Sequence, residues 1–131
     1  MESSIKDLAY VRLERAYEML VASRKNLDQE EYKTSLNRSY YAILHAMRSV
    51  NSIDGFDSSK HSGVISHFNQ HILKTGKMDS NLSDIIKKAS YRREKSDYDD
   101  FYVVSKREVE EQYNLAVLFV DAVKEYLDKI M

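Results

Sequence analysis

Apolar side chains recur three and four positions apart along almost the whole chain, and they do not alternate with polar ones. This spacing is typical of helices that bury one face. Pro is absent and Gly occurs only three times, so the residues that most often interrupt helices or form tight hairpins are scarce. The pattern predicts an all-α protein, an up-and-down bundle of about five helices in a single domain over residues 1–131.

Short polar segments divide this pattern into separate helices. The expected helices span residues 3–26, 28–52, 58–76, 80–96 and 105–127. Asp28 is the expected N-cap of the second helix, and Gly76 is expected to end the third in a left-handed conformation. Ser105 and Glu108 have the spacing with which a side chain at each position caps the amide of the other.

The charge balance gives no reason to expect general attraction to a polyanion. The 131 residues include 20 Lys plus Arg and 21 Asp plus Glu, which gives a formal charge of −1. Cys is absent, which excludes disulfides and thiolate chemistry. No apolar run resembles a signal peptide or is long enough to cross a bilayer. We therefore expect a cytoplasmic protein without a membrane partner, in which any anion binding is local.

The stretch "NRSYYAILHAMRSV" carries the strongest candidate chemistry. Arg38 and His45 are seven positions apart, within about 20° of two full helical turns, so they share a face and lie roughly 10 Å apart along the axis. Arginine offers a planar fork of donors to phosphate oxygens, and histidine exchanges a proton near neutral pH. The pair suits metal-free phosphoryl chemistry on RNA. His45 would be the general acid or base, and Arg38 would stabilise the charge that grows on phosphorus.

Structural roles explain the same two residues equally simply. Arg38 would then pair with a carboxylate from another helix, and His45 would lie in a subunit interface. The surroundings are apolar and aromatic, so charged groups there need a reason. The neighbours concerned are Tyr40, Tyr41, Leu44 and Met47. Such a surplus of apolar residues also predicts a homodimer whose interface includes the second helix.

Several segments together resemble the HEPN domain family. They are "NRSYYAILHA", "SSKHSGVISHF", "YRREKSDYDDF" and the apolar helix that contains "NLAVLFVDAVKEYL". The hallmark of that family is Arg, four to six intervening residues, and His, which Arg38 and His45 match in the longest form. The resemblance is greatest to small stand-alone members that are often encoded beside a minimal nucleotidyltransferase.

This resemblance implies a bundle that dimerises around the motif and acts as a metal-independent endoribonuclease, the toxin of a toxin–antitoxin or defence system. It implies a homodimer, RNA or a nucleotide as ligand rather than DNA, a nucleotidyltransferase antitoxin and no cofactor. The alternative is a non-catalytic module that binds a nucleotide or that partner. The residues expected to support the site or line a substrate groove are Asn37, Ser39, Tyr40, Tyr41, Arg93 and Asp97. One subgroup carries a tyrosine that its partner modifies, and Met47 occupies that position here.

Two further clusters carry less chemistry. His67 and His71 have the spacing of metal ligands on one helix face, but no Cys or acidic residue accompanies them in sequence, so we expect no metal site. His61, which opens the third helix, is expected to cap or pack that helix. The single local basic cluster is too small to indicate nucleic-acid binding by itself. It comprises Lys87, Lys88, Arg92 and Arg93.

Overall fold

The computed structural model describes residues 2–131 and contains five α-helices over that range. They are α1 (Ser3–Asp28), α2 (Tyr32–Asn51), α3 (His61–Phe68), α4 (Leu82–Tyr98) and α5 (Lys106–Ile130). A 3₁₀ turn, η1 (Ser52–Asp54), follows α2, and a π-helical turn, η2 (Asn69–Leu73), continues α3. No strand occurs in the described range. The prediction of an all-α fold is confirmed.

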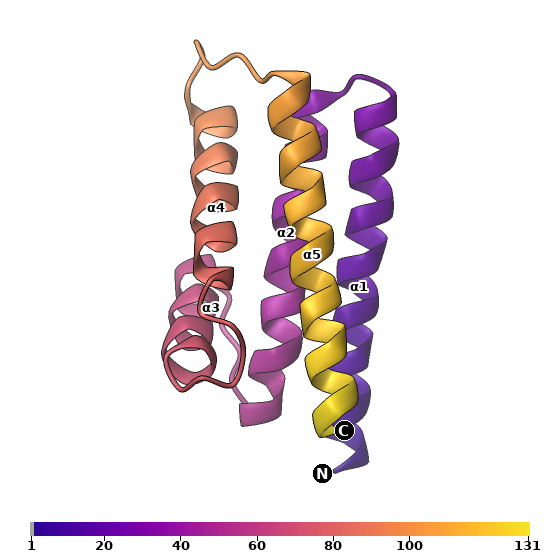
Figure 1. The fold of residues 1–131 in the computed structure, drawn as a ribbon, viewed down its shortest axis with the longest axis vertical. Helices are drawn as coiled ribbons and strands as arrows, with labels where there is room; N and C mark the ends of the chain where they lie inside the picture. The colour runs from indigo at the N-terminus through magenta and orange to yellow at the C-terminus, as the bar shows by residue number, and fades with distance from the viewer. Residues whose placement is uncertain (1) are drawn as a thin grey trace.

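The four long helices run side by side and alternate in direction, whereas α3 is seen almost end-on at the lower left of Figure 1. This arrangement confirms the up-and-down bundle. α2 lies behind α5 in this view and packs against each of the other α-helices. Within residues 2–131, no helix combines the length and the apolar character needed to cross a membrane. Because α2 contacts all the other α-helices, most of its side chains are buried and the few half-exposed ones lie beside neighbouring helices.

Small buried side chains bring α1 and α2 together. Ala9, Ala16 and Ser23 are fully buried at intervals of seven residues along α1. The hydroxyl of Ser49 on α2 donates a hydrogen bond to the carbonyl of Ala9. At the other end of the same interface, the hydroxyls of Ser23 and Ser39 lie 2.6 Å apart. The hydroxyls thus satisfy buried polar groups where larger side chains would separate the helices.

The first interhelical turn differs from the prediction. α1 continues through Asp28, because Leu27 is buried in a small apolar cluster with Leu36 and Val109. The chain then reverses at Glu30, whose φ of 61° lies in the left-handed region. The prediction of Asp28 as the N-cap of the second helix is therefore wrong.

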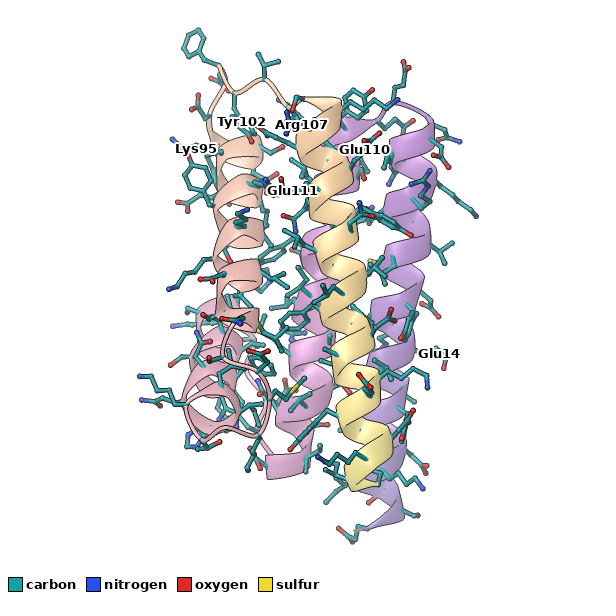
Figure 2. The ribbon with its side chains drawn as sticks, in the orientation of Figure 1. Glu14, Lys95, Tyr102, Arg107, Glu110 and Glu111 are labelled. Atoms are coloured by element: carbon teal, nitrogen blue, oxygen red, sulfur yellow. The ribbon has the colours of Figure 1, made fainter. Side chains whose placement is uncertain are left out.

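The other helix ends match the predictions in part. Gly76 has a φ of 75°, the left-handed conformation expected of it, but α3 begins only at His61 and passes into η2. The hydroxyl of Ser105 accepts a hydrogen bond from the amide of Glu108 at 3.1 Å, as predicted. The Glu108 carboxylate accepts a hydrogen bond from Tyr102 instead of returning to the cap. Figure 2 shows Tyr102 between the upper ends of α4 and α5.

Candidate active site

A strip of half-buried side chains follows one edge of α2. Its members, Arg38, Tyr41, His45 and Arg48, are three or four residues apart, so they lie one above another along the helix. Most of their neighbours on α2 are buried. We call this set the α2 strip. It is the part of the central helix that combines polar chemistry with partial access to solvent.

Arg38 is not bound to a carboxylate in the described part of the chain. Its Nη1 donates a hydrogen bond of 2.7 Å to Oδ1 of the adjacent Asn37. This contact does not support the alternative in which Arg38 forms a buried ion pair with another helix. Because the Asn37 amide is neutral, this bond leaves the positive charge of Arg38 uncompensated and available to an anionic ligand.

His45 is held in its neutral form. Burial lowers its pKa from the ordinary value, and the positive charges of Arg48, Arg15 and Arg12 lower it further. No side chain in residues 2–131 hydrogen-bonds to either ring nitrogen. Neither nitrogen is among the fully buried polar atoms that lack a partner. A neutral imidazole with a free nitrogen can accept a proton, which is the requirement for a general base.

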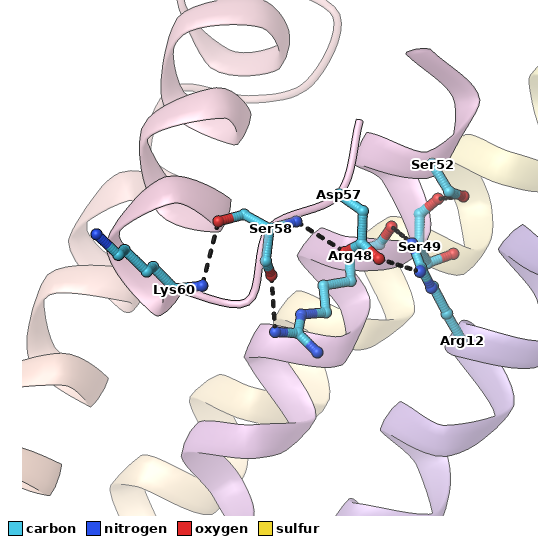
Figure 3. A network of polar contacts seen from close by, with 7 residues as sticks. All are labelled: Arg12, Arg48, Ser49, Ser52, Asp57, Ser58 and Lys60. Atoms are coloured by element: carbon cyan, nitrogen blue, oxygen red, sulfur yellow. Dashed lines mark hydrogen bonds and ion pairs between the residues drawn. The ribbon is translucent and has the colours of Figure 1, made fainter. Parts of the chain in front are cut away.

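Two of the arginines near His45 are fixed by the loop that follows α2, as Figure 3 shows. Arg48 Nη2 donates to the carbonyl of Ser58 at 3.1 Å. Arg12 of α1 donates to the carbonyl of Arg48 at 3.3 Å and pairs with Asp57 at 3.0 Å. These bonds hold positive charge beside His45. Sequence spacing could have indicated Arg48, three residues after His45, whereas Arg12 reaches the site only through the packing of α1 on α2.

The opposite side of the α2 strip is bordered by α3 and α4. The Arg93 guanidinium of α4 lies 4.8 Å from the ring centre of Tyr40 and 5.7 Å from that of Tyr41. Arg93 Nη1 and the Tyr40 hydroxyl lie 3.4 and 3.2 Å from Nδ1 of His61. Asp97 lies 3.4 Å from Arg93 Nε and so reaches the site only through Arg93. The sequence indicated Arg93 and Asp97 but not the participation of His61.

Several residues near the motif belong to the protomer core. Ser39 is fully buried and bonded to Ser23 of α1, so it does not line a groove in this structure. Tyr40, Leu44 and Met47 retain at most 4% exposure. The apolar surplus from which we predicted a dimer is therefore absorbed within the protomer. Packing of α2 against the other four α-helices buries these side chains, and a single sequence cannot distinguish that burial from an interface.

The remaining histidines form a separate cluster. His67 Nε2 lies 3.1 Å from Asp54 Oδ2, and the His67 ring stacks on Phe56 at 4.0 Å between ring centres. The centre of the His71 ring lies 4.4 Å from that of the His67 ring. Asp54 is an acidic partner that sequence spacing did not reveal. No three His, Asp or Glu side chains of residues 2–131 gather as a metal site would require.

The basic side chains predicted as one cluster on α4 contact two different helices. Lys88 and Arg92 pair with Glu111 of α5 at 3.1 and 2.8 Å, which ties α4 to α5. Glu111 lies between these two helices in Figure 2. Arg93 instead points to α2. The four residues therefore do not form one continuous cationic surface.

By its bundle and its α2 strip, this protein is a small all-α protein with an arginine and a histidine on one face of its central helix. The sequence model of the HEPN domain matches residues 9–126. The chain belongs to the HEPN domain family.

Three relatives match this chain over nearly their whole length. "Putative toxin MJ0142" of Methanocaldococcus jannaschii is 29% identical, covering 97% of this chain and 90% of its own. A "UPF0332 protein" of Thermotoga maritima is 28% identical, covering 99% and 98%. "Putative toxin MJ0605" of M. jannaschii is 28% identical, covering 100% and 97%.

Proposed function

We propose that this protein is a metal-independent endoribonuclease of the HEPN type and the toxin of a toxin–antitoxin or defence pair. The observation that carries the proposal is His45, a neutral imidazole with unpaired ring nitrogens beside Arg48, Arg15 and Arg12. Membership of the HEPN family supports the activity class. The names of the two M. jannaschii relatives support the role as a toxin, with a minimal nucleotidyltransferase as the proposed antitoxin.

The chemistry needs a base, a proton for the leaving oxygen and positive charge. His45 removes the proton from a ribose 2′-hydroxyl, and the 2′-oxygen attacks the adjacent phosphorus. The bond from phosphorus to the 5′-oxygen breaks, leaving a 2′,3′-cyclic phosphate, and the departing oxygen takes a proton from water. The hydroxide left behind is neutralised by the proton held on His45. Arginine side chains stabilise the charge that develops on the phosphoryl oxygens.

We place the Arg38 that serves each His45 in a partner protomer. Arg38 and His45 belong to the same α2 strip but are about 10 Å apart along the helix axis, and the side chain of Arg38 bonds to Asn37. A two-fold axis across this strip would bring Arg38 of one protomer toward His45 of the other. The proposed dimer thus rests on the separation of the motif residues and on the family, and no longer on surplus apolar surface.

The test compares His45→Ala and Arg38→Ala with wild-type protein in single-turnover RNA cleavage. Each variant should cut at least about a hundredfold more slowly while keeping its melting temperature, because neither side chain is ion-paired. His71→Ala, at an exposed histidine of η2, is the matched control and should cut at the wild-type rate. Wild-type protein that cuts no RNA, with variants that lose only nucleotide binding, would establish the non-catalytic module instead.

A further inference from the structure

His61 does not cap α3, although it is the first residue of that helix. The N-cap position is Lys60, and no side-chain cap bond is formed there. The His61 ring turns instead toward α2 and α4, where the Tyr40 hydroxyl lies 3.2 Å and Arg93 Nη1 lies 3.4 Å from its Nδ1. The Tyr41 ring meets it edge-on at 5.5 Å between centres. His61 is therefore oriented by three side chains from two other helices.

These contacts favour one tautomer of the ring. A guanidinium can only donate hydrogen bonds, so the contact with Arg93 favours an Nδ1 that carries no proton and accepts. The neutral ring then carries its proton on Nε2. Burial, followed by the charges of Arg93 and Arg48, lowers the pKa of His61 and keeps the ring neutral.

The Nε2–H group is an unused donor at the edge of the proposed active site. No side chain in residues 2–131 accepts a hydrogen bond from it. Nε2 is not among the fully buried polar atoms that lack a partner. The Tyr41 ring is near both histidines, with its centre 5.5 Å from that of His61 and 6.4 Å from that of His45. Arg93 and Arg48 both bring positive charge close to the His61 ring, which favours an anionic acceptor for its Nε2–H group.

We propose that His61 is a substrate-binding residue whose Nε2–H donates a hydrogen bond to a backbone phosphate oxygen of RNA next to the scissile linkage. The inference rests on the proposed function and assigns the two histidines different tasks. His45, with free ring nitrogens, transfers the proton. His61, with Nδ1 engaged by Tyr40 and Arg93, holds the RNA and transfers none.

Two substitutions separate this role from a structural one. His61→Asn places a polar atom near the Nδ1 position, which preserves a partner for Tyr40 and Arg93 but removes the outward donor. His61→Gln extends an amide toward the Nε2 position and restores that donor. We expect His61→Asn to weaken binding of a 2′-O-methylated RNA oligonucleotide about tenfold, and His61→Gln to bind within about twofold of wild type. A purely structural role predicts the reverse order, together with a lower melting temperature for His61→Gln, and would overturn the proposal.

The ring itself provides a second readout. Nitrogen-15 NMR of labelled histidine should show His61 as the neutral Nε2–H tautomer near pH 7, and an Nδ1–H tautomer or an imidazolium would contradict the proposal. The two proposals fail separately. If wild-type protein binds the oligonucleotide but cuts no RNA, the proposed ribonuclease activity is refuted. The binding of the His61 variants still tests the role of His61 in that case. Cleavage with unchanged binding by His61→Asn defeats only the role of His61, and protein that neither binds nor cuts defeats both.

Discussion

Ser39 follows the motif arginine directly, yet the structure gives it a packing role that can be measured. Its hydroxyl lies 2.6 Å from that of Ser23, which also bonds to Ser35 at 3.0 Å. Ser39→Ala removes one buried hydrogen bond and leaves the other in place, so the free energy of unfolding should fall by about 1 kcal/mol, or about 4 °C in melting temperature. Ser39→Leu adds bulk where the helices approach closely and should cost about 2–3 kcal/mol.

Urea unfolding followed by circular dichroism measures both changes, and RNA cleavage is assayed at low temperature where all variants remain folded. Thr34→Ala, at an exposed position of the same helix, is the control and should change stability by less than about 0.5 kcal/mol. The folded Ser39→Ala variant should cut RNA at the wild-type rate. Slower cleavage by this variant with an unchanged urea midpoint would show that Ser39 contacts substrate, and would refute the packing role.

Three further predictions concern pH, metal and assembly. Because folding lowers the pKa of His45 and of His61, the unfolded chain takes up protons more readily, so stability is fully present above about pH 6.5 and is lost as pH falls below it. The urea midpoint should therefore drop on acidification, and less so in His45→Gln; equal drops would contradict this. RNA cleavage should survive EDTA, whereas loss of activity with recovery on adding zinc or manganese would promote His67 and His71 to ligands. Sedimentation should show a dimer at micromolar concentration, and a monomer would remove the composite site.

The sequence predicts the helices well because apolar periodicity and the absence of Pro act locally. The helix ends are less accurate because they depend on tertiary packing. Asp28 has the chemistry of an N-cap, but burial of Leu27 extends α1 past it, and the turn is made at Glu30 by a non-glycine residue in the left-handed region. Ser105 is found correctly because its cap bond is formed within a single turn.

The same division applies to the candidate site. Arg38 and His45 share one helix, so their spacing places them on a common face. Arg12 and His61 come from α1 and α3, and their positions depend on how those helices pack on α2. The spacing of residues along the helix also does not show which side chains are buried. Tyr41 remains half-exposed, while its neighbours Tyr40, Leu44 and Met47 enter the core.

Subunit mixing tests the composite site most directly. Arg38→Ala and His45→Ala proteins, each inactive alone, are unfolded together, refolded and assayed for RNA cleavage. If Arg38 of one protomer serves His45 of the other, half of the dimers regain one intact site, and activity should return to roughly a quarter of the wild-type level. A mixture that forms heterodimers but stays inactive would contradict the composite site and place Arg38 and His45 of the same protomer in one site.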